Sequence, residues 1–312
     1  MGPSRNQPYS PPFKGGVAAQ RPGWLVKKSR SLLTDARAAL LLISSRTMKS
    51  IIVGLILLCV ACPLFAQLPA PNADGVTAGH HIFRAKDVDA ANKFWITLGG
   101  EPAALANIKL MRFPGVLLFI SAPRGANPAP SLGGNHGTTV EFITFKVKDL
   151  KAALAKLNEA GISAKSENGG ATIVGPDDVQ VRLTEDKSLE PPIASDGLVM
   201  NVANTAEVSA WYAKWFGAKI STRGGETVGE IPGARIVFRA TKDPIAPTKG
   251  HSLGLLGFEV KDLQDFVKRY QDAGGKLDTM IATAQAANLS VVQLTDPWGT
   301  SIEVSQGLKA VK

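Results

Sequence analysis

The sequence predicts an α+β protein built from four copies of one β-α-β-β-β unit. Three features follow one another four times along the 312 residues: an extended apolar stretch, an amphipathic helix, and a series of short strand-like runs. Such self-similarity indicates a repeated supersecondary unit. The residues that mark the four copies are separated by 62, 55 and 58 positions: Asp87, Asp149, Asn204 and Asp262.

The first strand and the helix of each unit are the clearest elements. The four openings read HHIFRAKD, EFITFKVKD, GLVMNVANT and GLLGFEVKD. Each marker residue is a natural N-cap, because its side-chain oxygen accepts from the first free N–H groups of a helix. A glycine that tolerates positive φ ends each helix: Gly99, Gly161, Gly217 and Gly274. These signals predict four helices of similar length.

The remaining elements follow from hydrophobic periodicity. Apolar residues at i, i+3, i+4 and i+7 form a stripe from Val208 to Trp215 and another from Leu263 to Tyr270, which indicates helices packed on a sheet. We interpret their aromatic residues as core and not as a ligand cage. The last strand of each unit is predicted at residues 116–122, 179–184, 234–239 and 300–304.

The domain organisation follows from the one linker-like break in the repeat. Residues 186–195 contain Pro191-Pro192 and separate the four units into two pairs. We therefore expect a first domain at 67–185 (units 1 and 2) and a second at 196–312 (units 3 and 4).

Residues 48–66 have the layout of a secretory signal peptide. Lys49 is followed by an apolar run from Ile51 to Cys62, and a small residue, Ala66, marks the expected cleavage site. The protein is expected to be exported to the periplasm or outside the cell, or to be membrane-anchored if this segment is retained. A lipid-modified Cys62 is disfavoured, since Cys59 stands where such signals usually carry Leu. Residues 1–47 are a basic extension, either a long leader or sequence upstream of a true start at Met48.

Charge and cysteine content exclude several function classes. The chain carries +9, but residues 1–66 hold nine basic residues and one acid, so the remainder is nearly neutral. No basic stripe is left for a nucleic-acid partner. Both cysteines lie in the signal segment, which excludes disulfides and thiolate chemistry from a cleaved chain. Walker, nucleophile-elbow, dinucleotide and His-Glu-x-x-His motifs are absent from the sequence.

The repeated unit, the opening HHIFRAKD and the closing TDPWGTSIEV together resemble the vicinal oxygen chelate superfamily, in a tandem two-domain form. This superfamily includes glyoxalase I, bleomycin-resistance proteins and extradiol dioxygenases. The resemblance covers roughly residues 77–307. It implies that paired units form cupped sheets around a metal site, with ligands from the first and last strands of each unit.

The ligand positions implied by this resemblance are mostly not metal-binding residues here. Across the four units they fall on His80 and Phe119, Phe142 and Arg182, Gly197 and Phe238, and Leu255 and Glu303. Only His80 and Glu303 are of metal-binding type. They imply a divalent ion (Fe, Mn, Ni or Zn), with Glu303 also able to act as a catalytic base and Leu255 in place of a second histidine.

The pairing of units decides whether His80 and Glu303 meet. If sequence neighbours pair, the two residues lie in different cups. If unit 1 pairs with unit 4, both face one cavity, and we favour this crossed pairing because both metal-type residues then share a cup. His80 is otherwise interpreted as an inward-facing strand histidine that only hydrogen-bonds.

Further residues are expected to line the two cups. Arg84 and Glu259 would lie in the cup of His80, either as an ion pair across adjacent strands or with Arg84 as a clamp for an anionic substrate. Phe119 and Leu255 would make that cup more apolar. The other cup would carry Lys146, Asn201 and Arg182, which suit an anion. His136 and His251 are expected to be exposed in or beside loops.

Two functions remain open. The first is a mononuclear-metal lyase, isomerase or dioxygenase acting on a small oxygenated substrate at His80 and Glu303. The second is a metal-free protein that binds an apolar or anionic small molecule. A scaffold whose sites have decayed is a third interpretation. In each case the expected partner is a small molecule, the chain is a monomer or homodimer, and the membrane is contacted only through the N-terminal segment.

Overall fold

The computed structural model describes residues 68–123, 133–167 and 169–311. The predicted basic extension at 1–47 and signal segment at 48–66 lie outside these residues. Within the described part, no helix is both long enough and apolar enough to cross a membrane.

The four predicted units are present. Unit 1 comprises β1 (Val76–Arg84), α3 (Val88–Leu98), β2 (Glu101–Leu105), β3 (Ile108–Phe113) and β4 (Val116–Ser121). Unit 2 comprises β5 (Val140–Val147), α4 (Leu150–Glu159), β6 (Ala164–Glu167), β7 (Gly170–Val174), the short η2 (Pro176–Asp178) and β8 (Gln180–Glu185). Unit 3 comprises β9 (Ile193–Val202), α5 (Thr205–Phe216), β10 (Lys219–Arg223), β11 (Glu226–Ile231) and β12 (Ala234–Ala240). Unit 4 comprises β13 (Leu253–Val260), α6 (Leu263–Asp272), β14 (Ala282–Ala284), η3 (Gln285–Ala287), β15 (Leu289–Thr295) and β16 (Ser301–Gln306), followed by η4 (Leu308–Ala310). Residues 186–192 connect β8 to β9.

The helix boundaries arise from the predicted caps. Asp87 Oδ1 accepts from the backbone N–H of Ala90 at 2.9 Å, and the other three marker residues cap their helices in the same way. Gly99 and Gly217 adopt positive φ as the C-caps of α3 and α5. The C-caps of α4 and α6 are Ala160 and Ala273, and the predicted glycines follow one residue later, also at positive φ. These local signals fix where each helix begins and ends, so the same unit recurs four times.

The strands form two eight-stranded sheets with crossed pairing of the units. Sheet 1 has the order β14-β15-β16-β13-β1-β4-β3-β2, and therefore joins unit 4 to unit 1. Sheet 2 has the order β10-β11-β12-β9-β5-β8-β7-β6 and joins unit 3 to unit 2. The crossed pairing favoured by the sequence is confirmed. Each sheet takes one unit from each side of the 186–195 break.

The central pairs, β1 with β13 and β5 with β9, are antiparallel. Both contain a register shift at equivalent places, at Gly79 in β1 and at Glu141 in β5. A bulge adds one residue to a strand and re-aims the neighbouring side chains. Both sites described below lie beside these bulges.

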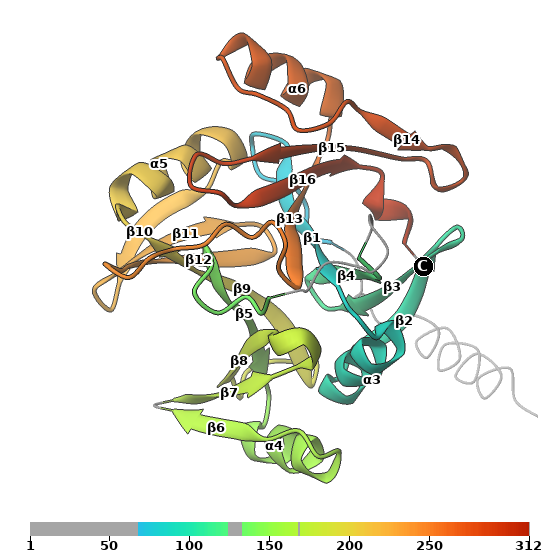
Figure 1. Cartoon of the computed structure of the whole chain (residues 1–312), viewed down its shortest axis with the longest axis vertical. Helices are drawn as coiled ribbons and strands as arrows, with labels where there is room; N and C mark the ends of the chain where they lie inside the picture. Colours follow the sequence, from blue (N-terminus) through green and yellow to red (C-terminus); the bar gives the residue numbers. More distant parts are fainter. Residues whose placement is uncertain (1–67, 124–132, 168, 312) are drawn as a thin grey trace, which may run out of the picture. The chain divides into compact units, whose positions relative to one another are not determined.

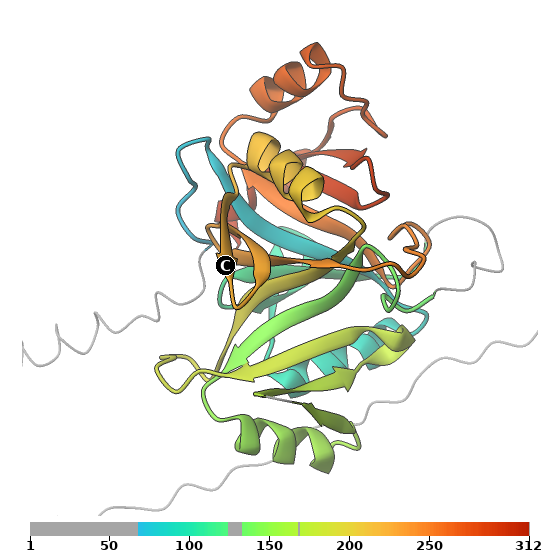
Figure 2. The ribbon, with the colours of Figure 1, turned by 90° about the vertical axis from the view of Figure 1, so that its left-hand side faces the viewer.

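Aromatic side chains pack between units that are neighbours in sequence, although the strands pair crosswise. In the first half Phe113 of unit 1 contacts Phe145 of unit 2, with ring centroids 4.7 Å apart. In the second half Phe216 of unit 3 stacks on Phe258 of unit 4 at 3.9 Å. Figure 1 shows the helices arranged accordingly, with α3 and α4 in its lower part and α5 and α6 in its upper part. The turned view of Figure 2 shows the same grouping on either side of the central strands.

Candidate functional site

His80 and Glu303 meet in the concave face of sheet 1, which we call the first cup. His80 lies on β1 and Glu303 on β16, with β13 between them. Gly257 of β13 is in register with both residues, and its missing side chain leaves room for them to meet. The His80 Nε2 and Glu303 Oε1 atoms are 3.0 Å apart, and both residues are buried.

The surroundings of this pair favour an ionised Glu303. Gln293 Nε2 donates to Glu303 Oε2 at 3.0 Å. Burial raises the pKa of Glu303, but the hydrogen bond and charge of His80, the Gln293 bond and the charge of Arg84 outweigh it, so the pKa lies below its ordinary value. On the opposite face of β1, burial and the charge of His80 lower the pKa of His81 to about 3, which keeps His81 neutral.

The donors of the first cup do not fit a mononuclear metal centre. Catalytic sites of this kind need at least three protein ligands. The remaining ligand positions carry Leu255 and Phe119, and the His80 and Phe119 rings pack nearly perpendicular to each other with their centroids 5.4 Å apart. Among the described residues no group of three or more His, Cys, Asp or Glu side chains could hold an ion. His80 Nε2 and Glu303 Oε1 bond to each other instead, whereas His80 Nδ1 is buried without a hydrogen-bond partner among the described residues.

Apolar side chains line the rest of the first cup and leave a pocket of about 300 Å³ beside Leu117 and Leu308. They come from β2, β3, β4, η3, β15 and the turn after β16, and the buried members are Leu105, Leu110, Leu117, Ala287, Leu289 and Leu308. Glu259 holds that turn in place: it accepts from Ser305 Oγ at 2.6 Å and from the backbone N–H groups of Gly307 and Leu308 at 2.7 and 3.0 Å. The hydrogen bonds of Glu259 therefore hold the turn that closes the cup, and we assign Glu259 no role in binding a ligand.

The predicted ion pair between Arg84 and Glu259 is wrong. Because β1 and β13 are antiparallel, equivalent positions of the two units lie at opposite ends of the pair. Glu259 is in register with Thr77, whereas Phe83, next to Arg84, is in register with Leu253. Arg84 Nη1 instead donates to Ser121 Oγ of β4. The role of Arg84 as a substrate clamp stays a prediction.

An open cavity lies in the concave face of sheet 2, which we call the second cup. Two adjoining pockets, of about 570 and 440 Å³, share the lining residues His136, Glu141, Phe142 and Glu167. Arg182 and Asn201 line the larger pocket, as the sequence predicts. Lys146 lies against Asp186 and Asp196, at 3.3 and 3.8 Å, and is not among the residues that line either pocket.

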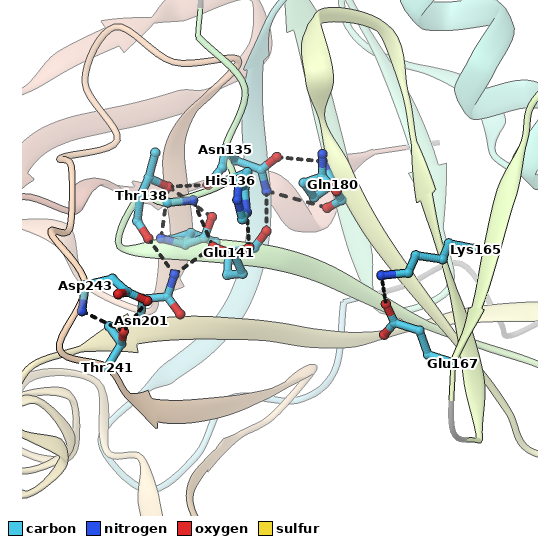
Figure 3. Close-up of polar contacts among 12 residues, drawn as sticks. Asn135, His136, Thr138, Glu141, Lys165, Glu167, Gln180, Asn201, Thr241 and Asp243 are labelled. Carbon is cyan, nitrogen blue, oxygen red and sulfur yellow. Dashed lines mark hydrogen bonds and ion pairs between the residues drawn. The ribbon is translucent and has the colours of Figure 1, made fainter.

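A polar network that the sequence did not reveal forms one wall of the second cup (Figure 3). His136 Nδ1 is 2.5 Å from Glu141 Oε1. Glu141 Oε2 accepts from the backbone N–H of Gly137 at 2.9 Å and from Asn201 Nδ2 at 2.6 Å. Glu141 is buried, whereas the His136 side chain is 78% exposed. The carboxylate is thus fixed by its surroundings and in turn fixes the imidazole.

The loop that carries His136 is held on the same strands. Asn135 Nδ2 donates to the carbonyl oxygen of Glu141 at 3.0 Å, and Asn135 Oδ1 accepts from the N–H of Gln180 at 2.6 Å. The sequence predicts His136 to be exposed, which is correct, but nothing in it assigns a partner. Strand alternation alone would point Glu141 and Phe142 to opposite faces of the sheet, so the sequence does not reveal Glu141. The bulge at Glu141 turns both side chains into the cavity.

Arg182 of β8 and Arg239 of β12 bring two guanidinium groups to the larger pocket. Arg182 Nη1 is 3.8 Å from Glu167 Oε2, and Arg239 Nη2 is 3.7 Å from Glu226 Oε1. Both distances exceed those of charge-assisted hydrogen bonds. These ion pairs therefore leave the N–H donors of both arginines open to a ligand.

Two eight-stranded sheets, each made from two βαβββ units around one concave face, define the tandem glyoxalase-like fold. Residues 195–304 match the family model described as the Glyoxalase/Bleomycin resistance protein/Dioxygenase superfamily. The resemblance to the vicinal oxygen chelate superfamily is therefore confirmed by sequence over these residues. No curated protein matches the sequence.

Solved structures agree on the fold. Glyoxalase I from Zea mays is 13% identical, with a TM-score of 0.57, over 75% of this chain and 93% of that chain. A mutant of the same maize enzyme gives a TM-score of 0.58 at 14% identity, over 76% and 94% of the two chains. A putative dioxygenase from Bacillus subtilis subsp. subtilis str. 168 is 13% identical, with a TM-score of 0.53, over 78% and 86%. At these identities the likeness is one of fold, and function must be argued from the site.

Proposed function

We propose that the protein binds an anionic small molecule in the second cup, without a metal ion. The observation that carries this proposal is the cavity of about 570 Å³ with Arg182 and Arg239 in its lining. Its volume is in the range of small-molecule sites. A guanidinium group matches a carboxylate, phosphate or sulfonate with two parallel N–H donors.

The rest of the lining supports a ligand with both polar and apolar parts. Phe142, Pro244 and Ile245 provide apolar surface beside the two arginines. Asn201 and Glu141 supply polar groups on the same wall. Polar and charged side chains outnumber the apolar ones in this lining, so a ligand can be bound and oriented through several polar contacts.

The alternative, a mononuclear-metal lyase, isomerase or dioxygenase at His80 and Glu303, has one observation in its favour: the two side chains are in contact. Against it, the described residues of the first cup offer no group of three metal-type side chains, and the pocket of about 300 Å³ in this cup has a mostly apolar lining. The proposed function therefore assigns the ligand to sheet 2.

A fluorescence titration with 8-anilino-1-naphthalenesulfonate tests the proposal, because this dye joins a sulfonate to an apolar ring system. We expect saturable binding that is unchanged by EDTA. Arg182→Gln should weaken the dye about tenfold, since a hydrogen bond to a charged group contributes on the order of 1.5 kcal/mol. Arg223→Gln is the matched control, because Arg223 forms an exposed ion pair with Glu230 on β10 and β11.

Two results would overturn this function. Dye binding that EDTA abolishes would show dependence on a metal ion. Equal affinities of the Arg182→Gln and Arg223→Gln proteins would show that the dye does not use the second cup. The double variant Arg182→Gln/Arg239→Gln extends the test, because loss of both guanidinium groups should weaken binding more than loss of one.

We also propose that the protein is exported, on the strength of residues 48–66 alone. The test is the mass of the mature protein after expression with its full leader. A chain that begins at Gln67 in the exported fraction supports cleavage after Ala66. A full-length chain in the membrane fraction would indicate an anchor, and one in the cytosol would refute export.

A further inference from the structure

We propose that His136 is a general acid–base residue of the second cup and that Glu141 is its positioning residue. The site would transfer a proton within an anionic small molecule that carries an acidic C–H or O–H group. This inference rests on the proposed function for the presence of a ligand, but its tests on His136 itself need no ligand.

The geometry of the pair is that of a carboxylate–imidazole dyad. When Nδ1 is bound to a carboxylate, that nitrogen carries the proton, and Nε2 keeps its lone pair. The 2.5 Å contact with Glu141 uses Nδ1, and the ring is exposed and lines both pockets. Nε2 is therefore the nitrogen that a molecule in the cavity can reach.

The remaining contacts of Glu141 explain why it can hold the ring still. Its Oε2 accepts from Gly137 N–H and Asn201 Nδ2, so the carboxylate cannot rotate without losing both hydrogen bonds. Asn135 fixes the loop of His136 to β5 and β8. A general base must be held within hydrogen-bond reach of the proton that it removes, and this network supplies that rigidity.

The proton transfer needs no co-reactant. The Nε2 lone pair forms an N–H bond with the proton of the ligand, and the electron pair of the broken C–H or O–H bond stays on the ligand. The carboxylate of Glu141 stabilises the imidazolium ion, and the guanidinium groups in the pocket bind the anionic ligand. Return of the proton to another atom of the ligand restores His136 and yields an isomer.

Carbethoxylation by diethyl pyrocarbonate at pH 8 measures the reactivity of Nε2. The chain has four histidines. His80 and His81 are 1% and 6% exposed, and Nδ1 of His251 is buried. We expect one fast-reacting histidine, which His136→Asn removes and His251→Asn leaves in place. Glu141→Gln should slow this reaction by about threefold or more, because the carboxylate holds the ring in place with the proton on Nδ1 and so leaves the Nε2 lone pair free to attack.

A second measurement on the unmodified protein keeps the proposal testable if Glu141→Gln does not fold. The ¹⁵N chemical shifts of the His136 ring report its tautomer. We expect the Nδ1-protonated tautomer in the neutral state. A predominantly Nε2-protonated ring would overturn the dyad, and so would equal carbethoxylation rates in the wild type and a folded Glu141→Gln protein.

The two proposals can fail separately. Protection of His136 from diethyl pyrocarbonate by 8-anilino-1-naphthalenesulfonate would place the dye and the imidazole in one cavity and support both. If the dye binds through Arg182 but leaves His136 fully reactive, the acid–base role falls and the binding function stands. If the dye does not bind while His136 shows the expected tautomer and reactivity, the binding function falls and the dyad stands.

Discussion

Gly257 is the position at which one methyl group should disrupt the first cup. It lies in register with both His80 and Glu303. A Cβ atom at residue 257 would lie 2.3 Å from His80 Nδ1 and 2.4 Å from two carbons of the same ring, whereas ordinary contacts begin at 3.4 Å. The ring would have to move by roughly 1 Å to relieve this overlap.

The expected cost of Gly257→Ala follows from what surrounds that ring. Phe119 packs against it on one side, and Glu303 is hydrogen-bonded to it at 3.0 Å. Overpacking costs about 1–3 kcal/mol. Loss of the His80 bond would add about 1–3 kcal/mol, because a buried carboxylate loses one of its two side-chain partners. We expect the free energy of unfolding to fall by about 2–6 kcal/mol in total.

Equilibrium unfolding in urea, followed by tryptophan fluorescence, measures this change. Gly254→Ala on the same strand is the matched control, since its nearest non-neighbouring atom would be 3.4 Å away. In a double-mutant cycle, His80→Ala should make Gly257→Ala far less costly, because the clashing ring is gone. A loss below about 0.5 kcal/mol for Gly257→Ala, or strict additivity in the cycle, would refute the reasoning.

Three further predictions concern the first cup. The pKa of Glu303 lies below its ordinary value of 4.5, so its stabilising contribution is present above about pH 4.5 and is lost as the pH falls through the lower pKa of the folded protein. Glu303→Gln should therefore flatten the acid side of the profile of unfolding free energy against pH. Parallel profiles of the variant and the wild type would contradict this prediction. Leu308→Ala should lower the free energy of unfolding in urea by about 2–5 kcal/mol, because Leu308 is 2% exposed in the apolar cluster; a loss under about 1 kcal/mol would show that the turn does not fill the cup. Elemental analysis of dialysed protein should find far less than one divalent ion per chain, and EDTA should leave the midpoint of thermal unfolding unchanged. One ion per chain would contradict the inference that the donors of the first cup do not fit a metal centre.

The parts of the fold that were predictable are those encoded locally. A cap such as Asp87 and a terminal glycine such as Gly217 act within one helical turn, so their positions in the sequence are enough. The crossed pairing was predictable for a different reason. His80 and Glu303 are the two metal-type residues among eight ligand positions, and one pairing brings them together. The contact between His80 and Glu303 was therefore predictable, and in the structure the two side chains are hydrogen-bonded to each other.

The parts that were not predictable depend on strand register. The antiparallel pairing of β1 and β13 separates Arg84 from Glu259, and no local signal in either strand records this. The bulge at Glu141 breaks the strand alternation that would otherwise point its side chain away from the cavity. Strand parity predicts Lys146 in the second cup, but its ammonium group pairs with two acidic residues, Asp186 and Asp196. Sequence spacing alone contains none of this information.

The crossed topology also imposes an order on folding. All strands of sheet 2 lie between Val140 and Ala240, so this sheet can close once that continuous stretch is available. Sheet 1 must wait, because Val76 of β1 pairs with Val260 of β13, and β16 ends only at Gln306. Contacts between such distant residues form slowly, since a long loop must first be closed. We therefore expect the sheet that carries the proposed site to form first, while β1 keeps an unpaired edge until the last unit arrives.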